Sequence, residues 1–242
     1  MRKYLYFLTP LVLFSCAEES VVPEVILDDT EYFPLEIGKH IDYQVDEIIY
    51  SNEGRQRDSS SYFLRESIVD SFVDDNGVTT YLVDRLIKSS KDEDWMYQQT
   101  WVAGVFNNEA IRIENNLTFV KLQLPPVREN TWNGNKYFDD EIMVDVGPEQ
   151  VSFFKNWQSQ YVELNTAVDI KDLSFPDVHI VQLANEENKL ELRWGYEQYA
   201  SGIGLIQKEL MILDTQCFDM CNSWEEKAEK GIIYRQYIID YN

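Results

Sequence analysis

The sequence has few histidines and none of the common catalytic motifs. Its 242 residues include only two histidines, His40 and His179, far apart in the chain. A hydrolase triad needs a nucleophile, a base and an orienting group, and no Gly-x-Ser-x-Gly, phosphate-loop, dinucleotide-glycine or zinc-protease motif occurs. We expect His179, in an alternating run, to be structural and His40, after a turn, to be exposed. These absences favour a protein that is not an enzyme and that has neither a cofactor nor a metal site.

Basic residues are scarce beside acidic ones, with 21 Lys and Arg against 43 Asp and Glu and a net charge of −22. So acidic a surface repels phosphate backbones, which argues against nucleic acid as a partner. Acidic clusters at residues 92–94 and 139–141 contain the residue types of a glycoside hydrolase. In so acidic a chain such clusters are expected in solvated loops, so a hydrolase acting on glycans is the least favoured function.

No hydrophobic run is long enough to cross a membrane. Arg2 and Lys3 precede an apolar run at residues 4–14, which as a helix would reach only about 16 Å of the roughly 30 Å required. The stretch Leu13-Phe14-Ser15-Cys16 resembles a bacterial lipobox, which implies cleavage before Cys16 and acylation of its thiol. The alternative is an ordinary signal peptide followed by an incidental cysteine.

The segment after Cys16 indicates how the chain is divided and where the protein is located. Residues 17–30 are polar and acidic and lack periodicity, as expected of a tether. We therefore expect a signal peptide at residues 1–15, a lipidated tether at 16–30 and a single β domain at 31–242. Ala17 is not the Asp of an inner-membrane retention signal, and the acidic pair at 18–19 resembles the export tags of surface-exposed Bacteroidetes lipoproteins. The resemblance implies attachment to the outer membrane through Cys16, with the face of that membrane left open.

Only two cysteines, Cys217 and Cys221, remain in the expected mature domain. In an oxidising envelope compartment two close cysteines indicate a local disulfide. Closing so short a loop stabilises the fold by only about 2 kcal/mol in the chain-entropy model. A metal site is one alternative, although it needs about four N or S ligands and neither histidine is near in sequence. Free thiols are the other.

Alternation of aromatic or β-branched residues with polar ones dominates the rest of the chain and predicts strands. In residues 190–196 Leu, Trp and Tyr alternate with Glu, Arg and Gly, the pattern of a sheet with one solvated face. Residues 41–45 alternate in the same way, and the phase then slips to Ile48 and Tyr50. This slip predicts a bulge near residues 46–47.

Turn signals separate these runs at short spacing and favour antiparallel pairing. Asn76-Gly77 supplies the positive φ angles of a tight hairpin, and residues 185–188 are a further turn candidate. Ser223 and Glu226 have the spacing of a capping box, with Gly231 as a helix stop. The predicted fold class is all-β, an antiparallel and strongly curved sheet or incomplete barrel with one short helix near the C-terminus.

Three segments carry distinctive motifs. The first is residues 32–38, Tyr-Phe-Pro-Leu-Glu-Ile-Gly; the second is Leu124-Pro125-Pro126 followed by Trp132; the third is residues 199–209, beginning Tyr-Ala-Ser-Gly-Ile-Gly-Leu. Together they resemble a group of uncharacterised Bacteroidetes lipoproteins, although Ile41 stands where that group usually has Trp. The resemblance implies a curved antiparallel sheet or open barrel, similar to lipocalin-like and lipoprotein-carrier folds. It brings no catalytic residues, because the group has no established activity.

The chain is rich in aromatic residues, with six Trp and 15 Tyr, which can stack on sugars or line an apolar cavity inside a curved sheet. The candidate ligand-binding residues are Trp95, Tyr97, Trp101, Trp157 and Trp194. We expect a non-enzymatic outer-membrane lipoprotein that binds an apolar or glycan ligand, or a partner protein, on its concave sheet face. The alternative is a structural component of an envelope assembly, in which these aromatic residues only pack the core and no ligand pocket exists.

Overall fold

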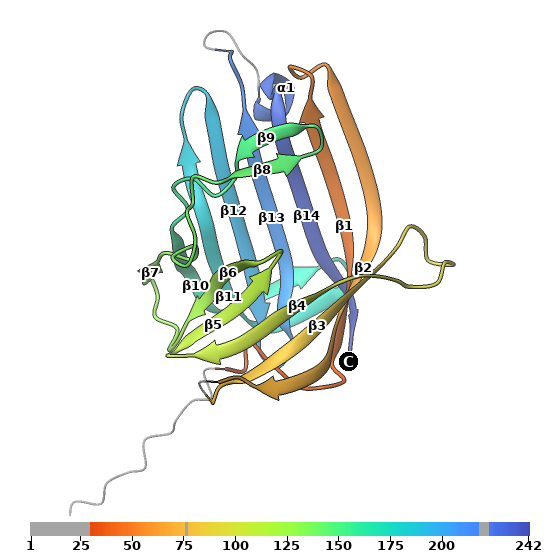
Figure 1. Ribbon diagram of the computed structural model, residues 1–242, viewed down its shortest axis with the longest axis vertical. Coiled ribbons are helices and arrows are strands. Elements are labelled where there is room, and N and C mark those ends of the chain that lie inside the picture. The colour runs from red at the N-terminus through yellow and green to blue at the C-terminus, as the bar shows by residue number, and fades with distance from the viewer. Residues whose placement is uncertain (1–29, 76, 218–222) are drawn as a thin grey trace, which may run out of the picture.

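The computed structural model describes residues 30–75, 77–217 and 223–242, which form one long curved sheet and a small hairpin (Figure 1). The elements are β1 (His40–Ser51), β2 (Gln56–Val73), β3 (Thr79–Lys88), β4 (Met96–Phe106), β5 (Glu109–Glu114), β6 (Leu117–Gln123), β7 (Thr131–Trp132), β8 (Met143–Val146), β9 (Glu149–Ser152), β10 (Ser159–Ile170), β11 (Leu173–Glu187), β12 (Glu191–Ala200), β13 (Gly204–Asp214), α1 (Trp224–Lys227) and β14 (Lys230–Tyr241). Twelve strands form one sheet in the order β6-β5-β4-β3-β2-β1-β14-β13-β12-β11-β10-β7, and β8 pairs with β9 outside it. All of these pairings are antiparallel.

The sheet curves until its two edge strands, β6 and β7, come together. Trp132 Nε1 on β7 donates a hydrogen bond to the carbonyl of Val120 on β6 at 3.0 Å. The backbone N–H of Val120 donates in turn to the carbonyl of Gly134, just beyond β7, at 2.8 Å. These bonds satisfy edge groups that an open sheet would expose. The sheet is therefore a nearly closed barrel, which confirms the predicted all-β, strongly curved fold with one short helix near the C-terminus.

Alternate side chains of each strand point into the barrel, where the largest buried cluster of apolar residues lies. The β8–β9 hairpin lies across β12, β13, β14 and β1 in Figure 1. Its buried Val146 and Val151 belong to the same cluster as Leu210 and Ile212 of β13. Lys230 also donates to the carbonyl of Gln150 on β9, at 3.0 Å. The hairpin therefore packs on the inner face of the sheet and covers one end of the barrel interior.

The predicted bulge at residues 46–47 is wrong. There β1 pairs with β2 and β14 without interruption, and the register shift on β1 lies between Asp42 and Tyr43. The apparent slip arises because β1 is apolar on both faces. Ile49 faces the interior cluster, whereas Tyr50 lies in a second cluster on the opposite face, beside Trp224 of α1.

Helix α1 occurs where the sequence predicts a helix, but its predicted ends are wrong. Ser223 occupies the N-cap position without a side-chain hydrogen bond, so the capping box does not form. Gly231 does not stop the helix; it lies within β14 with φ +123°. A Cβ atom there would lie 2.0 Å from the carbonyl oxygen of Ile212, so only glycine fits this close approach of two strands.

Several predictions fall on residues 1–29, 76 and 218–222, which lie outside the described residues. The signal peptide, Cys16 and nearly all of the tether are among them, as is Cys221. Lipidation and the Cys217–Cys221 disulfide therefore stay predictions. In the described part of the chain, no helix has the length and apolar character needed to span a membrane.

Candidate functional site

The main candidate site is a cavity of about 670 Å³ inside the barrel, between the sheet and the segment that runs from Gly134 to Ser159. Its volume falls within the range of typical small-molecule sites. Seven aromatic side chains make up much of its wall: Tyr62, Trp101, Phe119, Phe153, Phe154, Trp157 and Tyr234. Gln98, Asn115 and Met143, which also line it, are exposed. The cavity is therefore partly open to solvent.

Two of the five predicted ligand-binding residues, Trp101 and Trp157, line this cavity. Trp101 projects inward from β4, and the guanidinium groups of Arg85 and Arg112 lie 3.8 and 4.9 Å from its ring centroid. Trp157 lies in the turn after β9 and packs edge-on against Phe154, with ring centroids 5.3 Å apart. Residues 149–157 thus form the short strand β9 followed by this turn.

The other three candidates lie outside the cavity. Tyr97 is 62% exposed, because an irregularity between β3 and β4 pairs Leu86 with Tyr97 but Arg85 with Gln99. This shift places Tyr97 on the opposite face from Trp101, so Tyr97 cannot contact a ligand in this cavity. Trp95 contacts Arg65 and Lys88 rather than the interior. Trp194 packs on the cluster beside α1. The structure thus does not bring the five together.

Seven charged side chains form a connected group inside the barrel, which we call the interior charge cluster: Glu66, Arg85, Arg112, Glu114, Lys121, Glu197 and Lys208. They come from six strands, β2, β3, β5, β6, β12 and β13. Four of them, Arg85, Glu114, Lys121 and Lys208, also line the cavity. The cavity therefore has an aromatic wall and a charged wall.

The ion pairs of this cluster run as a chain across the interior. Glu66 contacts Arg85 at 3.3 Å and Arg112 at 2.9 Å. Glu114 contacts Arg112 at 3.6 Å and Lys121 at 3.1 Å. Glu197, which is fully buried, contacts Lys121 at 3.1 Å and Lys208 at 3.2 Å. It also accepts a hydrogen bond from the Tyr199 hydroxyl at 2.6 Å. Buried charges of this kind are tolerated only when they are paired in this way.

The pKa values of these groups follow from burial and from their partners. Burial acts to raise the pKa of Glu197, but the ammonium groups of Lys121 and Lys208 outweigh it and lower the pKa to about 2. Burial likewise opposes the effect of Lys121, Lys208 and Arg112 on Glu114, whose pKa lies well below its usual range. Both carboxyl groups are therefore ionised at neutral pH.

Two buried donors at the cavity wall have no hydrogen-bond partner among the described residues. They are the Asn135 side-chain Nδ2 and the Trp157 indole Nε1. Asn135 is only 2% exposed, so leaving its amide unpaired costs about 1–3 kcal/mol. Both donors suit a ligand with a hydrogen-bond acceptor.

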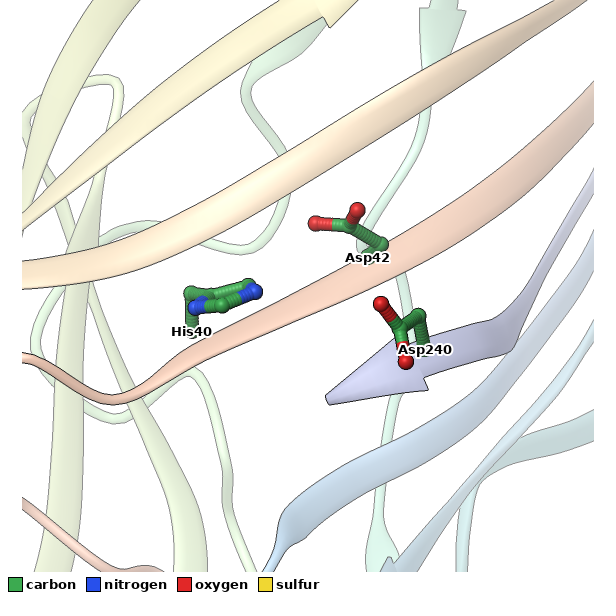
Figure 2. Close-up of side chains that lie close together, drawn as sticks. All are labelled: His40, Asp42 and Asp240. Carbon is green, nitrogen blue, oxygen red and sulfur yellow. The ribbon is translucent and has the colours of Figure 1, made fainter. Parts of the chain in front are cut away.

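A second group lies where β1 begins and β14 ends, and it consists of His40, Asp42 and Asp240. Figure 2 shows these side chains close together. Their possible ligand atoms lie within 4.8 Å of one another. Both carboxylate oxygens of Asp42, however, accept hydrogen bonds from Arg65, at 2.5 and 2.7 Å. We attribute the position of Asp42 to this bidentate ion pair. His40 is partly buried rather than exposed.

The remaining candidates have ordinary structural positions. His179 is buried and stacks on Tyr32 with ring centroids 3.6 Å apart, and its Nδ1 accepts from the backbone N–H of Asn165 at 3.3 Å. Residues 92–94 are exposed in the loop before β4, and residues 139–141 lie at the surface between β7 and β8. Neither acidic cluster lines the 670 Å³ cavity.

Comparison with known proteins gives little beyond this geometry. No family model and no curated protein matches the sequence. Two solved structures are similar to the chain. A Bacteroides fragilis protein assigned as exported, with a YmcC-like fold, is 10% identical over 86% of this chain and 97% of its own, with a TM-score of 0.40. A Parabacteroides distasonis protein assigned as a lipoprotein is 11% identical over 87% and 98%, with a TM-score of 0.41. At such TM-scores neither likeness carries an argument.

Proposed function

We propose that this protein is a non-enzymatic lipoprotein of the outer membrane, anchored through Cys16, that binds a small amphipathic ligand inside its barrel. The observation that carries the proposal is the interior cavity of about 670 Å³, with one aromatic and one charged wall. A core that served only to hold the fold together would be packed without so large a void.

The shape of the site favours a small molecule over a partner protein. The cavity lies inside the barrel and is covered on one side by residues 142–157, so a flat protein surface could not reach its walls. The seven aromatic side chains suit the apolar part of a ligand. The unpaired donors of Asn135 and Trp157 suit an acceptor on its polar part.

A scaffold without a pocket and a glycan hydrolase are the alternatives. The cavity weighs against the scaffold, which requires a filled interior. A glycosidase requires a protonated carboxyl as general acid, with a raised pKa. Glu114 faces the cavity, but its pKa is lowered by Lys121, Lys208 and Arg112 against the effect of burial. It is therefore unsuited to donating a proton.

The proposal is tested by blocking the cavity with one large side chain. Val144 on β8 lines the cavity, whereas its neighbour Asp145 is exposed and does not. We expect the purified domain to bind the neutral fluorescent probe N-phenyl-1-naphthylamine saturably at one site. Val144→Trp should weaken binding about tenfold or more, equivalent to about 1.4 kcal/mol, and Asp145→Trp should leave it unchanged. Circular dichroism checks that both variants fold. Absence of saturable binding to the native domain, or equal binding by Val144→Trp, would refute the proposal.

A further inference from the structure

The interior charge cluster contains one more cation than anions. Arg85, Arg112, Lys121 and Lys208 face only three carboxylates in its ion pairs, those of Glu66, Glu114 and Glu197. This excess is the reverse of the whole chain, whose net charge is −22. A buried excess charge is unfavourable unless a counter-charge is supplied.

Lys208 is one of two cations in the cluster with a single ion-pair partner among the described residues, the other being Arg85. Its ion-pair partner within the described residues is Glu197 Oε1, at 3.2 Å, and that same oxygen contacts Lys121 at 3.1 Å. The other oxygen of Glu197 is occupied by the Tyr199 hydroxyl. Lys208 therefore shares one acceptor atom with a second cation, and an ammonium group with three donors has capacity to spare.

Lys208 is also the member best placed to meet a ligand. Its side chain is 18% exposed, more than that of any other member, and it lines the cavity. Burial and the neighbouring ammonium group of Lys121 lower its pKa, with Glu197 and Glu114 acting in the opposite direction. This direction is the one expected of a cation that lacks a full counter-charge.

A further carboxylate, Glu47, lines the same cavity but does not compensate this excess through an ion pair. It accepts hydrogen bonds from the Tyr62 hydroxyl at 2.8 Å and from Ser60 at 3.4 Å. No ion pair of Glu47 within 4.0 Å occurs among the described residues. Compensation of the one excess positive charge of the cluster is therefore left to a ligand.

We propose that the cavity selects amphiphiles with a single anionic head group, a carboxylate or a phosphate ester, which binds Lys208 while the apolar chain lies against Trp101, Phe154 and Trp157. The inference rests on the proposed function and names its ligand class. A head group with one negative charge brings the cluster to equal numbers of positive and negative charges. It also supplies acceptor oxygens to the buried donors at the cavity wall, including Asn135 Nδ2.

The test is competition against bound N-phenyl-1-naphthylamine by three amphiphiles with the same twelve-carbon chain, each kept below its micelle concentration. These are dodecanoate, monododecyl phosphate and the neutral dodecanol. We expect at least one anionic amphiphile to bind about tenfold or more tightly than dodecanol, because charge-assisted hydrogen bonds are roughly twice as strong as neutral ones. The comparison between dodecanoate and the phosphate identifies which head group the site prefers.

Lys208→Met removes the excess charge and should fold, because Glu197 keeps Lys121 and Tyr199 as partners. It should reduce the preference for the anion over dodecanol to within about twofold, because the charge-assisted bond to the head group is lost. Lys208→Arg should retain the preference. Lys189→Met, at an exposed lysine outside the cavity, is the matched control for net charge.

The outcomes separate the inference from the function on which it rests. Equal binding of dodecanol and both anions by the native protein would overturn the inference and leave the binding function standing. A preference that survives in Lys208→Met would overturn the role of Lys208. If neither the probe nor any amphiphile binds, the proposed function fails and the inference fails with it. The comparison on the native protein decides the inference even if Lys208→Met does not fold.

Discussion

Replacing Glu197 by Gln should be one of the most destabilising single changes in this barrel. Its side chain is fully buried, and its two oxygens serve Lys121, Lys208 and the Tyr199 hydroxyl. Removing the negative charge leaves Lys121, itself 7% exposed, with only Glu114 as a counter-ion and Lys208 without an ion-pair partner among the described residues. Breaking a buried pair by removing one partner costs about 3–5 kcal/mol. We expect a loss near 3 kcal/mol, because the amide oxygen of Gln still accepts hydrogen bonds.

The measurement is urea unfolding followed by tryptophan fluorescence, with the slope m compared between variants so that a changed midpoint reports stability. Glu163→Gln is the matched control, since Glu163 pairs with Arg128 at 3.0 Å but the two side chains are 47% and 60% exposed. Exposed pairs of this kind contribute about 0–1 kcal/mol. Equal losses in the two variants would refute the claim that the interior charges are coupled in a water-poor environment.

Three further predictions concern the backbone, the pH dependence and the membrane anchor. Gly231→Ala should destabilise the folded protein by roughly 3 kcal/mol or more, because its Cβ would collide with the Ile212 carbonyl. The control Gly202→Ala, at φ +71° with open space around it, should cost only about 1–2 kcal/mol. Both losses are measured by urea unfolding. Because the pKa of Glu197 is lowered from 4.5 to about 2, the folded state binds fewer protons than the unfolded state between these values. The contribution of this carboxyl to the unfolding free energy should therefore be fully present above pH 4.5 and decrease on acidification towards pH 2, by at most about 1.4 kcal/mol per pH unit for each such carboxyl. An unfolding free energy that does not change in an acid-titration series would contradict this. Cys16→Ser should move the protein from the membrane to the soluble fraction of the envelope, and its retention with the membrane would contradict lipidation.

Strand positions could be predicted well because the local signals agree with the fold. The turn around Gly77 joins β2 to β3 and the turn after Glu187 joins β11 to β12, both near the predicted positions. Gly202 and Gly204 both have positive φ where β13 begins. These features depend on the backbone conformation of a few neighbouring residues. That conformation can be predicted from the types of those residues alone.

The charged interior could not be predicted, because alternation shows that a strand has two faces but not which face is inside. Residues 190–196 were interpreted as an apolar core face with a solvated polar face. In the structure the apolar phase, including Leu192 and Trp194, packs in the cluster beside α1. The polar phase points inward, where Arg193 is 2% and Glu197 0% exposed. A charged residue is taken as exposed unless its partners are known, and those partners lie on other strands.

The motif at residues 32–38 also shows that the spacing of apolar residues does not determine which of them are buried. Phe33 is buried and Leu35 packs partly against the core, whereas Ile37 is 54% exposed. The alternating spacing of these three residues would place all of them on one face of a strand, but residues 31–37 form no strand. A short loop has no fixed period of two, so its apolar residues cannot be assigned to one face from spacing alone.

Native mass spectrometry of the protein released from its own envelope can show whether the barrel interior holds a ligand. We expect one small molecule retained per protein in the native chain and in Asp145→Trp, and none in Val144→Trp, whose added side chain occupies the cavity. A native chain that carries no bound molecule, or a Val144→Trp variant that retains the same one, would contradict this expectation.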